Sequence, residues 1–173
     1  MKQHLKVKQL CQLALLFALA VVLSFLENLI PPLVVAVPGI KLGLSNIVVM
    51  YCLFYLGTGY SGILLLLKFG FALLTRGVTA AFLGACGGIC SLLIMLLLAK
   101  MFHCSAFFTS CFGGIFHNIG QLLGASILLN QVVWAYTPVL VISGVIMGII
   151  TGKLLQVVLP ILHRQVLSSN TKK

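Results

Sequence analysis

One apolar run of the chain reads T-A-A-F-L-G-A-C-G-G-I-C-S-L-L-I-M-L-L-L-A-K-M-F over residues 79–102. Its single charged residue, Lys100, stands near the end of the run. A helix needs about 20 predominantly apolar residues to cross the hydrocarbon core of a bilayer. The run therefore predicts a membrane-spanning helix.

Five further apolar runs accompany this one along the chain. The sequence of 173 residues is 61% hydrophobic and 7% charged, whereas soluble domains carry about 25% charged residues. We therefore expect an all-α integral membrane protein, a bundle of six transmembrane helices that forms one domain over residues 1–173. The second and third runs are short for a straight crossing. The predicted spans cover about residues 10–26, 42–56, 61–75, 79–102, 106–129 and 132–159.

The charges of the chain are strongly unbalanced, with eleven Lys and Arg against one acidic residue and a formal net charge of +10. Most of these cations flank apolar runs, where they orient the protein and meet anionic lipid headgroups. Nucleic-acid binding is excluded, because no solvated basic domain is predicted. The positive-inside rule places both termini in the cytoplasm, and the protein in the cytoplasmic membrane, with residues 37–46 on the outer side.

Residues 37–46 read V-P-G-I-K-L-G-L-S-N and interrupt the apolar pattern. Pro38 and Gly39 disfavour a helix, because proline lacks a backbone donor and glycine costs about 1 kcal/mol in a helix interior. Irregular backbone at membrane depth is tolerated where protein or a water-filled cavity surrounds it. We therefore expect a binding site here, with Lys41 as a ligand contact.

A second polar cluster, G-G-I-F-H-N-I-G-Q, covers residues 113–121 in the fifth predicted span. His117 and Gln121 share one helix face, and Asn118 lies about 100° round the helix. Such groups are costly in a membrane unless they are paired. The pattern leaves three interpretations open: interhelical hydrogen bonds, ligand contact, and a metal or proton relay.

Lys68 falls near the middle of the third predicted span, where a lysine costs about 2.5–3.5 kcal/mol on insertion scales. Glu27 is the single carboxylate available to offset it. Lys68 could pair with Glu27, extend to the membrane surface, or converge with Lys41 and Arg76 on an anionic ligand. The sequence does not decide between these arrangements.

The residues that the chain lacks limit its chemistry. It has no Asp and one Glu, so a carboxylate clamp for a Mg²⁺-diphosphate is not expected. It also has no P-loop. Cys86 and Cys90 are the closest pair of the six cysteines, but no His, Asp or Glu joins them, so neither a disulfide framework nor a zinc site is indicated. We expect a protein that is not an enzyme, without cofactor or metal, and an integral membrane prenyltransferase is disfavoured.

Small residues recur at spacings that let helix backbones approach closely. Each set fits either packing inside this chain or docking onto a separate membrane subunit. The sets are Ala14 and Ala18 in the first span, Gly84 and Gly88 in the fourth, and Gly144, Gly148 and Gly152 in the sixth.

Several of these motifs together resemble a known family. The chain is similar to the heptaprenyl diphosphate synthase component I family, also called the Gx transporter family, over about residues 10–155. The motifs that carry the resemblance are P-G-I-K-L-G-L-S-N, the R-G after the third span, G-G-I-C-S-L-L-I-M, H-N-I-G-Q, and P-V-L-x-x-S-G from Pro138 to Gly144.

That family in turn resembles the substrate-binding S components of energy-coupling factor (ECF) transporters. These are six-helix proteins that dock through an A-x-x-x-A motif onto a transmembrane coupling subunit, which two ATPases drive. Ala14 and Ala18 match this docking motif. Lys68 stands where arginine is usual in the family, which keeps the charge but not a bidentate contact. The resemblance implies substrate contacts near the outer side by Lys41, Asn46, His117, Asn118 and Gln121, to which the charge pattern adds Lys68 and Arg76.

The sequence thus predicts an S-component-like protein that captures a small anionic or amphipathic molecule related to isoprenoids, quinones or flavins. Its expected partners are the ECF coupling subunit, the ATPase subunits, the substrate and membrane lipid. The alternative is a non-catalytic membrane subunit of heptaprenyl diphosphate synthase, or of a membrane quinone or redox system.

Overall fold

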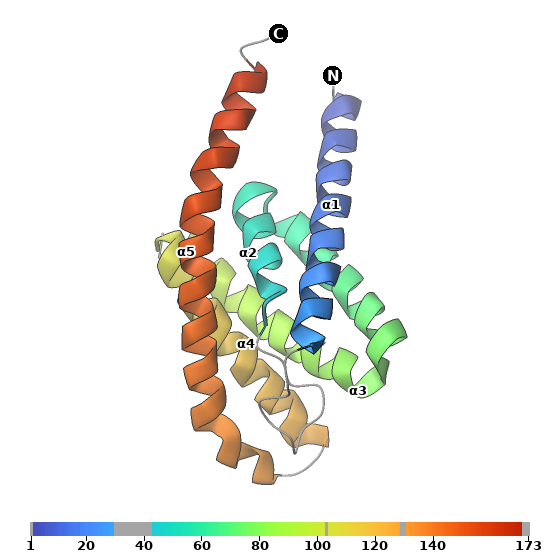
Figure 1. Cartoon of the computed structure of the whole chain (residues 1–173), viewed down its shortest axis with the longest axis vertical. Helices are drawn as coiled ribbons and strands as arrows, with labels where there is room; N and C mark the ends of the chain where they lie inside the picture. Colours follow the sequence, from blue (N-terminus) through green and yellow to red (C-terminus); the bar gives the residue numbers. More distant parts are fainter. Residues whose placement is uncertain (1, 30–42, 103, 129–130, 171–173) are drawn as a thin grey trace.

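The described part of the chain is almost entirely helical. The computed structural model describes residues 2–29, 43–102, 104–128 and 131–170, and no strand occurs in these ranges. Figure 1 shows how the helices are arranged. In chain order they are α1 (Lys2–Asn28), α2 (Asn46–Tyr55), α3 (Thr58–Lys100), α4 (Ala106–Leu128), the 3-10 helix η1 (Gln131–Tyr136) and α5 (Thr137–Asn170).

Four of these helices contain segments that are long and apolar enough to cross a bilayer. This confirms an all-helical, multi-pass membrane protein. The prediction of six crossings is not confirmed by helix length, because α2 has 10 residues and a helix of that length covers only about half of the hydrocarbon core. The four segments are Gln9–Glu27, Thr58–Lys100, Ala106–Leu128 and Val133–Leu154.

Helix α3 is broken at Gly77, where the backbone has φ 84° and ψ 174°. A residue with a Cβ rarely adopts this conformation, which is essentially reserved for glycine. The predicted third and fourth spans, residues 61–75 and 79–102, lie on either side of the break. Figure 1 shows the chain changing direction there. The break places Arg76 at the end of the first half of α3.

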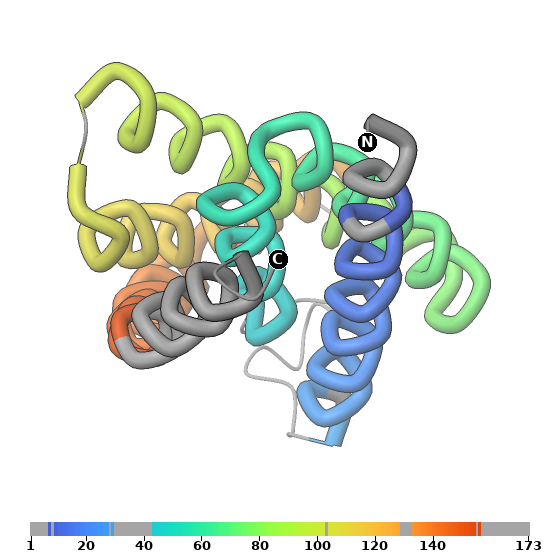
Figure 2. The backbone as a smooth tube through the Cα atoms, turned by 90° about the horizontal axis from the view of Figure 1, so that it is seen from above, coloured from blue at the N-terminus to red at the C-terminus, as the bar shows by residue number. Residues whose placement is uncertain are grey.

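The short helix α2 occupies the centre of the bundle, between α1 and α5 in both Figure 1 and Figure 2. It contacts α1, α3, α4 and α5, and Val48, Val49 and Cys52 are fully buried. Helix α2, which is short for a crossing, is therefore surrounded by other helices of the protein. The N-terminal end of α1 and the C-terminal end of α5 lie at the same end of the molecule (Figure 1).

The glycine ridge of α5 packs inside the chain, against α4. A methyl group added at Gly148 would lie 2.6 Å from the Cα atom of Cys111, and one at Gly144 would lie 3.0 Å from the carbonyl oxygen of Gly114. Backbone therefore meets backbone along this seam, as small residues permit. Of the two interpretations left open for this ridge, the structure supports packing within the chain.

Candidate functional site

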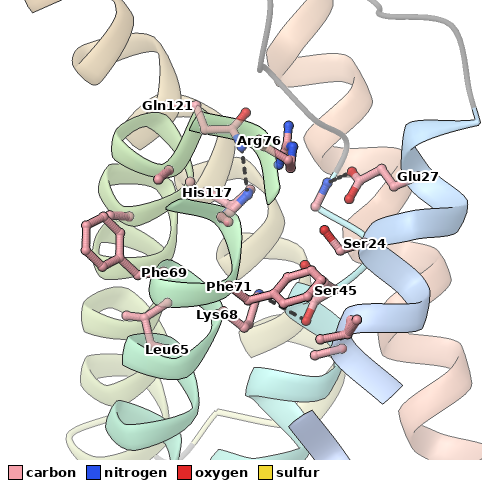
Figure 3. A pocket seen from close by; sticks show the side chains of 17 residues that line it. Ser24, Glu27, Ser45, Leu65, Lys68, Phe69, Phe71, Arg76, His117 and Gln121 are labelled. Atoms are coloured by element: carbon pink, nitrogen blue, oxygen red, sulfur yellow. Dashed lines mark hydrogen bonds between the residues drawn. The ribbon is translucent and has the colours of Figure 1, made fainter. Parts of the chain in front are cut away.

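A pocket of about 60 Å³ lies among α1, α3, α4 and the residues just before α2. Figure 3 shows the side chains that surround it. Both halves of α3 contribute, because the break at Gly77 lets the helix pass the pocket twice. The lining residues are Ala20, Val21, Ser24, Glu27, Gly43, Ser45, Leu65, Lys68, Phe69, Phe71, Ala72, Arg76, Ala81, Gly84, Ala85, His117 and Gln121.

Two cations from the first half of α3, Lys68 and Arg76, line this pocket together. The ammonium group of Lys68 donates a hydrogen bond to the backbone carbonyl of Ser45 at 3.2 Å. Arg76 interacts electrostatically with Glu27. Both residues are partly buried, so the structure favours convergence on the pocket over extension of Lys68 to the membrane surface.

Glu27, near the end of α1, fixes the chain at the entry to α2. It is 5% exposed, and its Oε1 atom accepts hydrogen bonds from the backbone N–H groups of Gly43 and Leu44. A carboxylate placed before the first turn of a helix also interacts favourably with the helix dipole. The carboxylate therefore ties α1 to the start of α2 and faces Arg76 across the pocket (Figure 3).

His117 and Gln121 bring the polar face of α4 to the same pocket. The Nε2 atoms of the two side chains are 3.0 Å apart. The two side chains are therefore hydrogen-bonded to each other. A methyl group at Gly43 would lie 2.9 Å from Cδ2 of the His117 ring. Because Gly43, with φ 88°, has no Cβ, its backbone can approach the imidazole closely.

The two asparagines of the predicted site make contacts between helices. The Asn46 amide donates to Ser91 Oγ at 2.7 Å, which links α2 to α3. Asn118 donates to the Leu140 carbonyl at 2.7 Å and to Ser143 Oγ at 3.0 Å, which links α4 to α5. Neither residue lines the main pocket, although Asn46 lines a smaller cavity of about 10 Å³ next to His117. These bonds match the interhelical interpretation of the polar cluster.

Three predicted residues remain. Lys41 falls outside the described residues. Ala14 and Ala18 are exposed on α1, away from the pocket. The structure thus brings together Lys68, Arg76, His117 and Gln121.

One family of known proteins matches most of the chain. The profile of heptaprenyl diphosphate synthase component I matches residues 16–158. The chain belongs to the heptaprenyl diphosphate synthase component I family. This confirms the resemblance that the motifs indicated. A search of curated proteins and a search of solved structures gave no match.

For a heptaprenyl diphosphate synthase component I protein, the pocket reveals lining residues that the sequence interpretation did not include as site residues. Gly43, Ser45 and Glu27 belong to it. The sequence could have indicated Glu27 as a site residue, because a lone carboxylate in a membrane protein needs a partner. Gly43 and Ser45 act through backbone atoms, and both belong to residues 37–46, where the sequence predicts a binding site.

The pocket of this component I protein combines charged and amide side chains with an apolar wall. Lys68 and Arg76 supply positive charge, and Gln121 supplies a neutral donor group beside them. No three His, Cys, Asp or Glu side chains are grouped as for a metal within the ranges that the structure covers. The arrangement is suited to holding a negatively charged group at the edge of an apolar space.

Proposed function

We propose that this chain is the substrate-capturing membrane component of an ECF-type uptake system, with six helices and both termini in the cytoplasm. Its substrate is a small anionic or amphipathic molecule. The observation that carries the proposal is the convergence of Lys68 and Arg76 on one pocket inside the bundle. Lys68 lies near the middle of the third predicted span, where a lysine costs about 2.5–3.5 kcal/mol, and this cost favours a role in binding.

The polar groups around the pocket are arranged for binding. Glu27 is engaged with the backbone of Gly43 and Leu44, so it holds the pocket wall in place. His117 and Gln121 are hydrogen-bonded to each other and are therefore held in position before a ligand arrives. A site that is formed in advance loses less conformational entropy on binding.

The surface of α1 supports docking onto a partner. Ala14 and Ala18 are exposed between larger apolar side chains such as Leu10 and Leu15, which are 64% and 73% exposed. Small residues in such a groove let a second helix approach closely. The sequence has no P-loop. In the proposed system, the energy for uptake therefore comes from the ATPase subunits that drive the coupling subunit.

Ligand retention tests the binding proposal. Native mass spectrometry of the full chain in detergent should show a retained small molecule, and Lys68→Gln or Arg76→Gln should lower its occupancy at least about tenfold, since a charge-assisted bond is lost. Lys100→Gln is the matched control, because it removes one exposed cation that does not line the pocket. A wild-type protein that is empty, or variants that retain the molecule as well as the control does, would contradict the proposal.

Partner docking is tested separately. Ala14→Leu combined with Ala18→Leu should abolish co-purification with an ECF coupling subunit while the chain stays folded, because the helix groove is filled. Leu15→Ala is the control on the same helix, since it removes an exposed bulky side chain without filling the groove. Unchanged assembly of the double variant would count against this surface.

The second candidate is a non-catalytic membrane subunit of heptaprenyl diphosphate synthase or of a quinone system. The family description supports it, because it names a component of that enzyme. The lack of Asp and the use of Glu27 to hold backbone groups favour a non-catalytic role. Co-purification with a soluble prenyltransferase subunit in place of a coupling subunit would favour this candidate. Extension of farnesyl diphosphate by the purified chain alone would refute both.

A further inference from the structure

The smaller cavity beside the main pocket lies where α2, α4 and α5 meet. Its volume is about 10 Å³, which is about the space that one water molecule needs. Gly43 and His117 line both cavities, so the small cavity adjoins the wall of the main pocket. Each of the three helices contributes a polar side chain to its lining, namely Asn46 from α2, Ser110 from α4 and Thr151 from α5.

The side-chain oxygen of Asn46 has no hydrogen-bond partner among the described residues, although the residue is only 8% exposed. Ser91 fixes which atom of the amide is left over. Its hydroxyl donates to the Gly113 carbonyl at 2.8 Å, so it accepts from the NH₂ group of Asn46 at 2.7 Å. The atom of Asn46 that still needs a partner is therefore an acceptor, and a buried acceptor without a partner is costly.

The two hydroxyl groups of the lining can also accept hydrogen bonds. Ser110 donates to the Gly148 carbonyl at 2.9 Å, and Thr151 donates to the Met147 carbonyl at 2.6 Å. A hydroxyl group has one hydrogen and two lone pairs, so each oxygen can accept while it donates. A small group that donates hydrogen bonds would therefore match the oxygen atoms that these helices bring to the cavity.

A metal cation would also be attracted to oxygen atoms, but the lining does not provide a counter-charge for it. Glu27 holds the only side-chain carboxylate of the sequence, and it does not line this cavity. A buried ion that is not neutralised is costly. Water is neutral, donates two hydrogen bonds, and occupies polar cavities of this size in other proteins.

We propose that this cavity is a binding site for one water molecule, which donates hydrogen bonds to Oδ1 of Asn46 and to the hydroxyl oxygen of Ser110 or Thr151. A bridging water of this kind is nearly as favourable in enthalpy as a direct hydrogen bond. It joins the first turn of α2 to α4 and α5, directly beside the wall of the main pocket. The site goes beyond the proposed function, because it is the same whichever molecule the main pocket binds.

Radiolytic hydroxyl-radical labelling of the full chain in lipid nanodiscs, read out by mass spectrometry, tests the site. The radicals form from water, so a buried methionine is oxidised rapidly only where a water molecule lies beside it. Met50 lines the cavity and is 1% exposed, whereas Met95 is 0% exposed and does not line it. Met50 should therefore be oxidised at least about tenfold faster than Met95.

A double variant tests which groups hold the water. Ser110→Ala with Thr151→Val removes both hydroxyl groups, and a buried water needs at least about two polar partners. The oxidation rate of Met50 should fall to that of Met95. The matched control is Ser126→Ala with Thr75→Val, because these hydroxyl groups also donate to helix carbonyls but line neither cavity. The control should leave the rate unchanged.

Three outcomes would overturn the proposal. Oxidation of Met50 as slow as that of Met95 in the wild-type protein would show that the cavity is dry. Rapid oxidation that the double variant does not slow would show that the two hydroxyl groups do not hold the water. A cation is distinguished by replacing sodium and potassium with choline at constant ionic strength, and a lower thermal stability in choline would overturn water as the occupant. The proposed function is decided separately, by the molecule that the main pocket retains.

Discussion

The contact between Gly43 and His117 offers a sharp test of how the segment before α2 is held over the pocket. Gly43→Ala adds a methyl group to a residue with φ 88°, and that group would lie 2.9 Å from Cδ2 and 3.3 Å from Nε2 of the imidazole. The ring cannot move freely, because its Nε2 atom is bonded to Gln121. The substitution therefore forces either the backbone or the ring to shift.

The expected cost has two parts. A residue with a Cβ in this backbone region costs about 1–2 kcal/mol, and overpacking of a buried contact costs about 1–3 kcal/mol. Gly43→Ala should therefore lower the free energy of unfolding by about 2–5 kcal/mol. Gly57→Ala is the matched control. Gly57 has φ 98° and ψ 179°, and an added methyl group would meet nothing within 4 Å, so only the backbone part applies, at about 1–3 kcal/mol for this region.

The assay is equilibrium unfolding of the full chain in mixed micelles, followed by helical circular dichroism. The double variant Gly43→Ala with His117→Ala completes a mutant cycle, and it should regain the contact part of the loss, because the ring that the methyl group meets is absent. Equal destabilisation by Gly43→Ala and Gly57→Ala, together with no coupling between Gly43 and His117, would refute the packing described here.

Two further predictions concern packing and hydrogen bonding. Gly148→Ala should lower the free energy of unfolding by about 1–3 kcal/mol, because the methyl group would meet the Cα atom of Cys111 at 2.6 Å. At Gly62 in α3, an added methyl group would meet nothing within 4 Å, so Gly62→Ala should instead raise the free energy of unfolding by about 0.4–1 kcal/mol. Equal effects of Gly148→Ala and Gly62→Ala in the unfolding assay would contradict the close packing of α4 against α5. Ser91→Ala should lower the free energy of unfolding by about 1–3 kcal/mol, because the Asn46 amide loses its acceptor. An unchanged unfolding midpoint would show that this hydrogen bond does not contribute to stability.

The helical runs can be read from the sequence because hydrophobicity and length are local properties. In lipid, the backbone N–H and C=O groups of an apolar run have to be hydrogen-bonded within the protein, and a helix satisfies all of them within one segment. Helix α2 differs from the other predicted spans, because its 10 residues are short for a crossing and most of its side chains are buried among other helices. The sequence predicts a boundary between two runs where α3 is broken, but the geometry of the break depends on the single backbone conformation of Gly77.

The candidate site is predictable in part. Polar and charged residues inside apolar runs are rare, so Lys68, His117 and Gln121 stand out from the sequence itself, and Arg76 stands out as the one charge between the third and fourth runs. Asn118 stands out in the same way, yet it bonds to the carbonyl of Leu140 on α5. A helix turn of about 100° per residue separates it from His117, and only the positions of the neighbouring helices decide which of the two faces the pocket.

The sequence by itself thus determined the membrane class, the helical runs and the family, since these follow from composition and local motifs. The tertiary structure alone decided which charges meet. Glu27 of α1 accepts a hydrogen bond from the backbone of Gly43 and interacts with Arg76, whereas Lys68 donates a hydrogen bond to the carbonyl of Ser45. These partners are brought together by packing between helices that are distant in the chain, and no local pattern encodes that packing.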